Sequence, residues 1–101
     1  MKYEISESKI DGKGVIATKN LKKGDYIGIA IKNIQYGGIL FNITEELGKY
    51  INHAEDATGK LIKQGDKYIL KAKKAIKKGE EVAVNYYNTP WFILGPNPTW
   101  E

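Results

Sequence analysis

The chain has 101 residues, of which 42% are hydrophobic, 28% charged and 11% aromatic, and its net charge is +4. This length predicts one domain with a modest core, since single domains usually form at roughly 100–150 residues, and the apolar content excludes general disorder. The absence of cysteine and the single histidine exclude a disulfide scaffold, a thiol nucleophile, a thiolate zinc site and a histidine-based metal cluster. All 16 basic residues are lysine, and without the arginine fork we expect no sequence-specific nucleic-acid partner.

The apolar runs are all short. The longest, around residues 26–31 and 91–94, fall far below the ~20 residues of a membrane span. Residues 1–5 alternate between polar and apolar side chains and show no signal-peptide core. We therefore expect an intracellular protein with no membrane partner.

Short strands with turns between them are predicted along most of the chain. Residues 26–31 alternate isoleucine with small residues, which is the period of a strand with one bulky face. In residues 82–86, Val82, Val84 and Tyr86 are expected to share a face. The predicted strands are residues 2–5, 15–17, 26–31, 68–70 and 82–86, with a turn at residues 11–14.

One segment is predicted to be helical. Asn42 or Thr44 can cap it, Glu45 and Glu46 suit its first turn, and Gly48 can end it after one to two turns. The elements together predict a mostly β domain with one short helix.

A nine-residue pattern occurs twice. Residues 19–27 (KNLKKGDYI) match residues 74–82 (KAIKKGEEV), each with an apolar residue, two lysines, a glycine and an acid before a strand. The pattern predicts the same tight turn used twice, with Gly24 and Gly79 at positive φ. The lysines are expected to form a solvated face.

Two polar motifs are candidates for binding. Gly12-Lys13-Gly14 can bring backbone N–H groups close to a ligand, or it can be an ordinary hairpin turn. Asn52-His53 offers amide donors, acceptors and an imidazole at one place, although a lone histidine is more often structural.

Two aromatic motifs lie near the C-terminus. Tyr86-Tyr87 ends the last predicted strand, where a hydroxyl can position a substrate or simply complete aromatic packing. Trp91-Phe92 follows a proline and can form a wall for a flat ring, or can close the core.

These features follow one another in a fixed order along the chain. The order is residues 12–18 (GKGVIAT), 21–25 (LKKGD), 50–53 (YINH) and 76–86 (IKKGEEVAVNY). In this order they resemble the SET domain of protein lysine methyltransferases, over residues 3 to about 91. The short segment at residues 28–47 resembles the compact stand-alone SET proteins of viruses and microbes.

The resemblance implies a fold and a function. The fold is a SET-type β-clip of small sheets with one short helix and a C-terminal pseudoknot, as a single minimal domain over residues 1–101 with a tail at 92–101. The implied activity is protein-lysine N-methyltransferase, moving a methyl group from S-adenosylmethionine to a lysine ε-amine of a protein or peptide. A microbial chain is then expected in the cytoplasm, and a viral one in the host nucleus. The implied site residues are catalytic Tyr86, the cofactor-binding residues Gly12, Lys13, Gly14, Asn52, His53 and Trp91, and the channel residues Tyr50 and Tyr87, with no metal.

Two alternatives belong to other classes. A catalytically inactive SET-like module would bind a basic peptide or self-associate. A small polyanion-binding β domain would rest on the +4 charge alone. Because the middle segment is short, we also expect that a second copy could complete the substrate groove in a homodimer.

Overall fold

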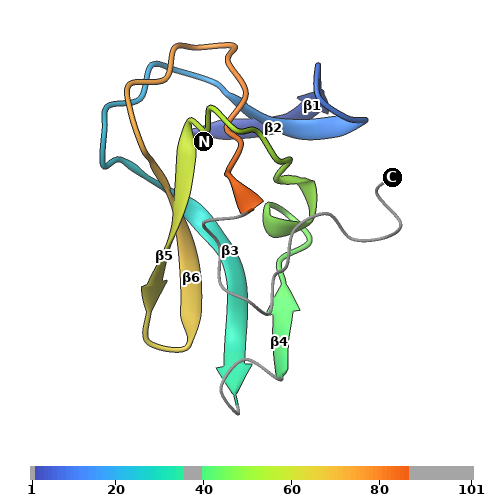
Figure 1. The fold of residues 1–101 in the computed structure, drawn as a ribbon, viewed down its shortest axis with the longest axis vertical. Helices are drawn as coiled ribbons and strands as arrows, with labels where there is room; N and C mark the ends of the chain where they lie inside the picture. The colour runs from blue at the N-terminus through green and yellow to red at the C-terminus, as the bar shows by residue number, and fades with distance from the viewer. Residues whose placement is uncertain (1, 36–39, 87–101) are drawn as a thin grey trace.

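The computed structural model describes residues 2–35 and 40–86, which form two small antiparallel sheets (Figure 1). The first sheet pairs β1 (Tyr3–Glu7) with β2 (Lys13–Ala17). The second sheet has the strand order β4-β3-β6-β5, and its strands are β3 (Tyr26–Gln35), β4 (Leu40–Ile43), β5 (Gly59–Gln64) and β6 (Lys67–Ala72). The mostly β prediction is confirmed. Among the described residues, no helix has the length and apolar character needed to cross a membrane.

The predicted alternation in β3 is interrupted. Its register with β6 shifts between Ile29 and Ile31, so Ala30 and Ile31 are both buried, and Ile29 is only partly buried. At this irregularity the carbonyl groups of Ile29 and Ala30 accept hydrogen bonds from Thr44, in the segment after β4. Thr44 is buried there, and its hydroxyl donates to the Ile29 carbonyl at 2.7 Å.

The predicted helix at residues 44–48 is wrong in extent and position. Residues 45–47 form a turn, and only Gly48–Tyr50 forms a single 3₁₀ turn, labelled η2. The Thr44 hydroxyl donates to a carbonyl of β3, and it also accepts the Gly48 N–H at 2.8 Å. Gly48 is the first residue of the 3₁₀ turn, and a Cβ at this position would overlap the Ala30 carbonyl oxygen. The glycine therefore permits close approach to β3 and does not end a helix.

The predicted strand at residues 82–86 is also wrong. Within the segment only Val84 makes an isolated bridge, parallel to His53, and the preceding Glu81 makes another, antiparallel to Ile16. Both faces of the segment are buried, since Val82, Ala83 and Val84 are each at most 3% exposed. It runs between several partners and does not extend one ladder. The parallel bridge places Val84 beside His53. The rest of the predicted C-terminal pseudoknot, at residues 87–101, lies outside the described residues.

The two lysine-glycine turns pack against each other, as the backbone bonds of their apolar residues show. Leu21 and Ile76 exchange N–H···O bonds of 2.7 and 2.9 Å. Gly24 and Gly79 have φ values of 92° and 90°, so the predicted turn geometry is confirmed. Each glycine donates its N–H, at 2.8 Å, to the alanine that precedes the other copy, Gly24 to Ala72 and Gly79 to Ala17. The sequence repeat is therefore a local two-fold arrangement of the backbone.

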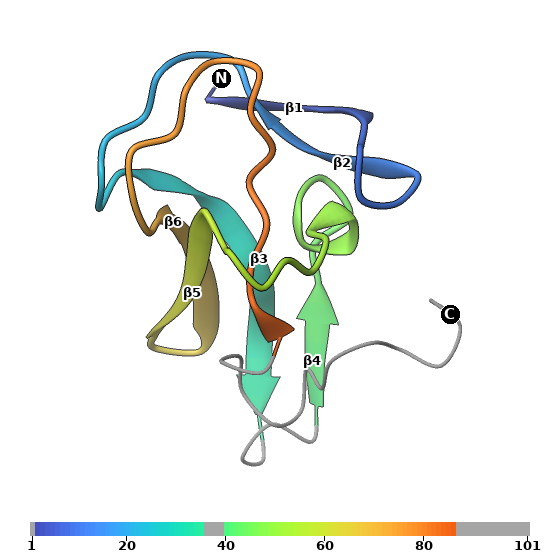
Figure 2. The same cartoon turned by 45° about the horizontal axis from the view of Figure 1, so that its top comes forward.

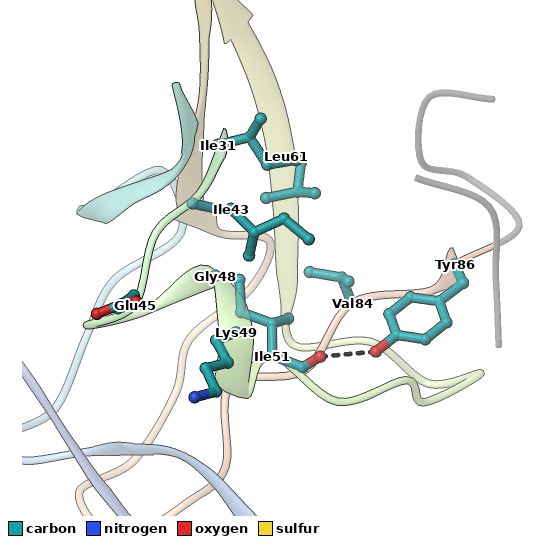
Figure 3. Close-up of a pocket in the computed structure, with 10 residues that line it drawn as sticks. Ile31, Ile43, Glu45, Gly48, Lys49, Ile51, Leu61, Val84 and Tyr86 are labelled. Atoms are coloured by element: carbon teal, nitrogen blue, oxygen red, sulfur yellow. Dashed lines mark hydrogen bonds between the residues drawn. The ribbon is translucent and has the colours of Figure 1, made fainter. Parts of the chain in front are cut away.

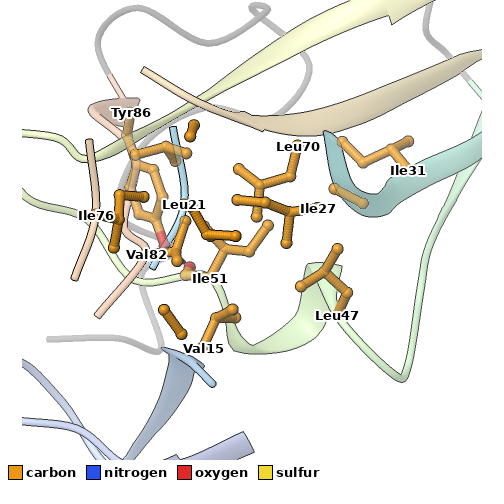
Figure 4. Packing of buried hydrophobic residues seen from close by; sticks show 14 residues of the cluster. Val15, Leu21, Ile27, Ile31, Leu47, Ile51, Leu70, Ile76, Val82 and Tyr86 are labelled. Atoms are coloured by element: carbon orange, nitrogen blue, oxygen red, sulfur yellow. Dashed lines mark hydrogen bonds between the residues drawn. The ribbon is translucent and has the colours of Figure 1, made fainter. Parts of the chain in front are cut away.

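The core lies between the two sheets and the segment at residues 82–86. Figure 4 shows aliphatic side chains from β2, β3 and β6 meeting those of the lysine-glycine turns and of Leu47 and Ile51, the residues on either side of η2. Tyr86 belongs to this cluster and is 7% exposed. Its position is thus fixed by core packing, which matters for the site described next.

Candidate functional site

Tyr86 is held by two hydrogen bonds. Its hydroxyl donates to the Ile51 carbonyl at 2.7 Å, and its backbone N–H donates to His53 Nδ1 at 3.0 Å. The His53 and Tyr86 ring centroids are 5.0 Å apart. Burial raises the pKa of Tyr86 to about 12, and the Asp11 carboxylate adds to this shift. The phenol is therefore neutral at physiological pH.

Asn52 joins the glycine turn to the centre of the molecule. Its Nδ2 lies within hydrogen-bond distance of the Asp11 and Lys13 carbonyls, at 3.1 and 3.2 Å. It also lies 3.0 Å from Ser8 Oγ and 2.9 Å from Glu81 Oε2. Two amide hydrogens share these four acceptors, so the amide is fixed in orientation. In the described part of the chain, Asn52 Oδ1 accepts no hydrogen bond.

The Glu81 carboxylate completes this network. Ser8 Oγ donates to Glu81 Oε1 at 2.6 Å and accepts the N–H groups of Ile10 and Asp11 at 2.9 and 3.2 Å. A Cβ at Gly14 would overlap the Glu81 carboxylate and approach Ser8 Cβ at 2.9 Å. Gly14 is therefore required to make room for Glu81.

Two cavities meet at Tyr86. The first, which we call the polar cleft, has a volume of about 490 Å³. The second, which we call the apolar pocket, has a volume of about 370 Å³ and is shown in Figure 3. Lys49, Ile51 and Tyr86 line both. The polar cleft is also lined by Ile10, Asp11, Lys13, Asn52 and His53, and the apolar pocket by Ala30, Ile31, Ile43, Glu45, Gly48, Leu61 and Val84.

The structure brings together four of the predicted site residues. Lys13, Asn52, His53 and Tyr86 all line the polar cleft. Gly12 lies in the neighbouring turn with a φ of 44°.

The other predicted site residues lie elsewhere. Gly14 packs under Glu81, as described above. Tyr50 lines neither the polar cleft nor the apolar pocket, and its ring lies 5.7 Å from Lys49 Nζ. Tyr87 and Trp91 lie outside the described residues.

The sequence interpretation missed several residues at this site. Ser8 and Glu81 have no local motif that marks them as partners of Asn52, because they are 44 and 29 positions away. Lys49 and Ile51 flank the predicted Tyr50, and Asp11 precedes the glycine turn. These three could have been found only as neighbours of the motifs.

The sequence matches the model of one protein family. The model of the SET domain matches residues 31–87, more than half of the chain. The chain belongs to the SET domain family. Its fold is similar to the crystal structure of a Plasmodium falciparum protein described as a candidate histone methyltransferase, with a TM-score of 0.69 and 21% identity over 89% of this chain and 100% of that one.

A second solved structure also has this fold. The SET domain of the tumour suppressor RIZ1 (PRDM2) aligns with a TM-score of 0.64 and 20% identity, over 91% of this chain and 73% of that one. At these identities the two structures establish the SET fold alone. No curated protein matches the sequence.

Proposed function

We propose that this SET domain is a protein-lysine N-methyltransferase that uses S-adenosylmethionine. The observation that carries the proposal is the meeting of a polar cleft and an apolar pocket at Tyr86 and Ile51. A methyl transfer between two substrates needs such an arrangement, because each reactant must reach the same point from its own side.

The polar cleft suits S-adenosylmethionine in size and charge. Its volume of about 490 Å³ lies within the roughly 300–1,000 Å³ of small-molecule sites. The methionyl part carries an ammonium and a carboxylate. Asp11 and Asn52 Oδ1 can accept from the ammonium, and Lys13 and Lys49 can pair with the carboxylate. When bound, this cofactor supplies a methyl group on a positively charged sulfur, which a neutral amine can take.

The apolar pocket suits the side chain of a substrate lysine. Ile31, Ile43 and Leu61 offer an aliphatic lining for the lysine stem. A desolvated channel lowers the pKa of the entering amine, so its proton leaves to water before transfer. Tyr86 is neutral and already donates to Ile51, so it serves as an orienting group and hydrogen-bond acceptor and not as a base.

The proposal is tested by incubating the chain with isotopically labelled S-adenosylmethionine and a library of lysine peptides, read by mass spectrometry. We expect labelled lysine with the wild type. Tyr86→Phe should lower turnover by roughly 10- to 1000-fold while cofactor binding persists, the loss typical of an orienting group. Tyr26→Phe, at an exposed tyrosine outside both cavities, is the matched control.

Two results would contradict the proposal. Equal turnover of the wild type and Tyr86→Phe would remove Tyr86 from the mechanism. Binding of S-adenosylmethionine without transfer to any peptide would favour the inactive module.

A further inference from the structure

The positive charge of the chain is concentrated in two short segments. Residues 17–25 and 72–80 contain seven lysines and two acids, whereas the remainder of the chain has nine lysines and ten acids. All seven lysines are exposed. We call this surface the lysine end, and its members are Lys19, Lys22, Lys23, Lys73, Lys74, Lys77 and Lys78.

The fold, and not the sequence alone, makes these lysines one surface. The two segments are 55 positions apart but are joined by the Leu21–Ile76 bridge and by a 2.9 Å bond from the Lys78 N–H to Asn20 Oδ1. Figures 1 and 2 show the two loops side by side at one edge of the molecule. The two-fold arrangement therefore duplicates a Lys-Lys pair on the same end.

These segments contain only two carboxylates, Asp25 and Glu80, for seven lysines. Asp25 Oδ2 accepts the Lys22 backbone N–H at 2.8 Å, and Glu80 Oε1 accepts the Lys77 N–H at 2.6 Å. Both acids are thus held by the turn backbone. Among the described residues, the one salt bridge at this end joins Lys74 to Asp56 at 2.8 Å. The ammonium groups of the other six lysines form no salt bridge within residues 2–35 and 40–86, although Lys73 also interacts electrostatically with Asp56.

We propose that the lysine end binds the phosphate backbone of nucleic acid without regard to sequence. Lysine is a point charge with no bidentate geometry, which suits a repeating chain of phosphates recognised by charge alone. An anionic membrane is a poorer fit, because the apolar residues of both turns, Leu21 and Ile76, are 3% and 1% exposed and cannot anchor in lipid. The surface lies outside the residues of the polar cleft and apolar pocket, so it adds to the proposed methyl transfer and is independent of it.

The test is fluorescence anisotropy of a labelled 20-base-pair DNA duplex with the full chain and no methyl donor. Binding should weaken by about 100-fold or more between 50 and 200 mM salt, since about four phosphate contacts give a log–log slope of roughly −3.6. Changing Lys22, Lys23, Lys77 and Lys78 to glutamine should abolish most of this binding and flatten the slope. The matched control changes the exposed Lys9, Lys32, Lys60 and Lys63 to glutamine, with the same loss of charge.

Each outcome decides the proposal. Loss of binding in the first variant and retention in the control support it. Equal losses would show that total charge matters and not this surface, and no binding by the wild type at 50 mM salt would overturn it. Binding to phosphatidylserine vesicles but not to DNA would also overturn it. Circular dichroism checks folding, and if the fourfold variant unfolds, Lys23→Gln with Lys78→Gln gives the same comparison against Lys9→Gln with Lys63→Gln.

Discussion

Removing the Glu81 carboxylate should weaken cofactor binding through Asn52. The carboxylate accepts from Ser8 Oγ at 2.6 Å and from Asn52 Nδ2 at 2.9 Å, so Glu81→Ala removes two charge-assisted hydrogen bonds. Hydrogen bonds to charged groups make a net contribution of about 1.5–3 kcal/mol each. If about 1–2 kcal/mol of this orients Asn52, the dissociation constant of S-adenosylmethionine should rise about 5- to 30-fold.

Glu81→Gln should have a smaller effect. The amide keeps the size of the side chain but offers one acceptor and one donor. If the oxygen of the new glutamine faces Asn52, the bond to Asn52 is kept. The glutamine NH₂ then faces Ser8 Oγ, which can no longer donate to this side chain and already accepts the N–H groups of Ile10 and Asp11. One of the two original bonds is therefore preserved, and we expect an intermediate dissociation constant.

Titration calorimetry with S-adenosylmethionine and thermal unfolding together separate positioning from simple stability. Glu55→Ala and Glu55→Gln are the controls, because Glu55 is an exposed carboxylate that lines neither cavity. The reasoning is refuted if folded Glu81→Ala binds as tightly as the wild type, or if the Glu55 variants weaken binding equally. A lower melting temperature with an unchanged dissociation constant would make Glu81 a structural residue only.

Three further predictions concern binding, packing and titration. Asn52→Ala should weaken S-adenosylmethionine binding by about 1–3 kcal/mol, the usual cost of an unsatisfied partner, and calorimetry should show no such loss for the exposed Asn42→Ala. Gly48→Ala should destabilise the fold more than Gly28→Ala in denaturant titrations, because the first new methyl overlaps a backbone carbonyl and the second meets only the end of a leucine side chain, at 2.7 Å. Since the Tyr86 pKa is raised to about 12, the native state holds a proton that the unfolded chain loses near 10. Stability should therefore fall as pH rises from about 10 to 12, and Tyr86→Phe should show a smaller fall in its unfolding midpoint over that range; equal falls would show that Tyr86 does not contribute.

Local patterns predicted the turns well, and tertiary contacts explain where prediction failed. A tight turn requires a positive φ at its glycine, and this requirement depends only on neighbouring residues. The conformations of Gly24 and Gly79 could therefore be predicted from the sequence. The predicted strand at residues 82–86 failed because alternation cannot reveal a segment buried on both faces, as Ala83 shows. Strand β5 was missed because its polar residues obscure the strand period, and β4 was missed because it is only four residues long and its Asn42 was interpreted as a helix cap.

The candidate site could be predicted only through family resemblance. The spacing of Asn52 and Tyr86 in the sequence does not imply that they border one cleft. They do so because the tertiary fold brings residues 51–54 beside residues 82–86. Ser8 lies outside the predicted motifs, and the motif that contains Glu81 does not mark it as a partner of Asn52, so only the three-dimensional structure shows that both hold the Asn52 amide. Long-range polar networks of this kind leave no periodic signal in a single sequence.

Hydrogen bonds between residues 51–52 and residues 84–86 connect the walls of the two cavities. Val84 donates its N–H to the Asn52 carbonyl at 3.1 Å, and two residues later the Tyr86 hydroxyl reaches the Ile51 carbonyl. Val84 lines the apolar pocket, and Asn52 lines the polar cleft. A shift of either segment is therefore expected to change both cavities, because Ile51 and Tyr86 line both of them. Core substitutions at Val84 should accordingly alter binding on both sides of Tyr86 together, whereas Glu81→Ala should affect the polar cleft alone.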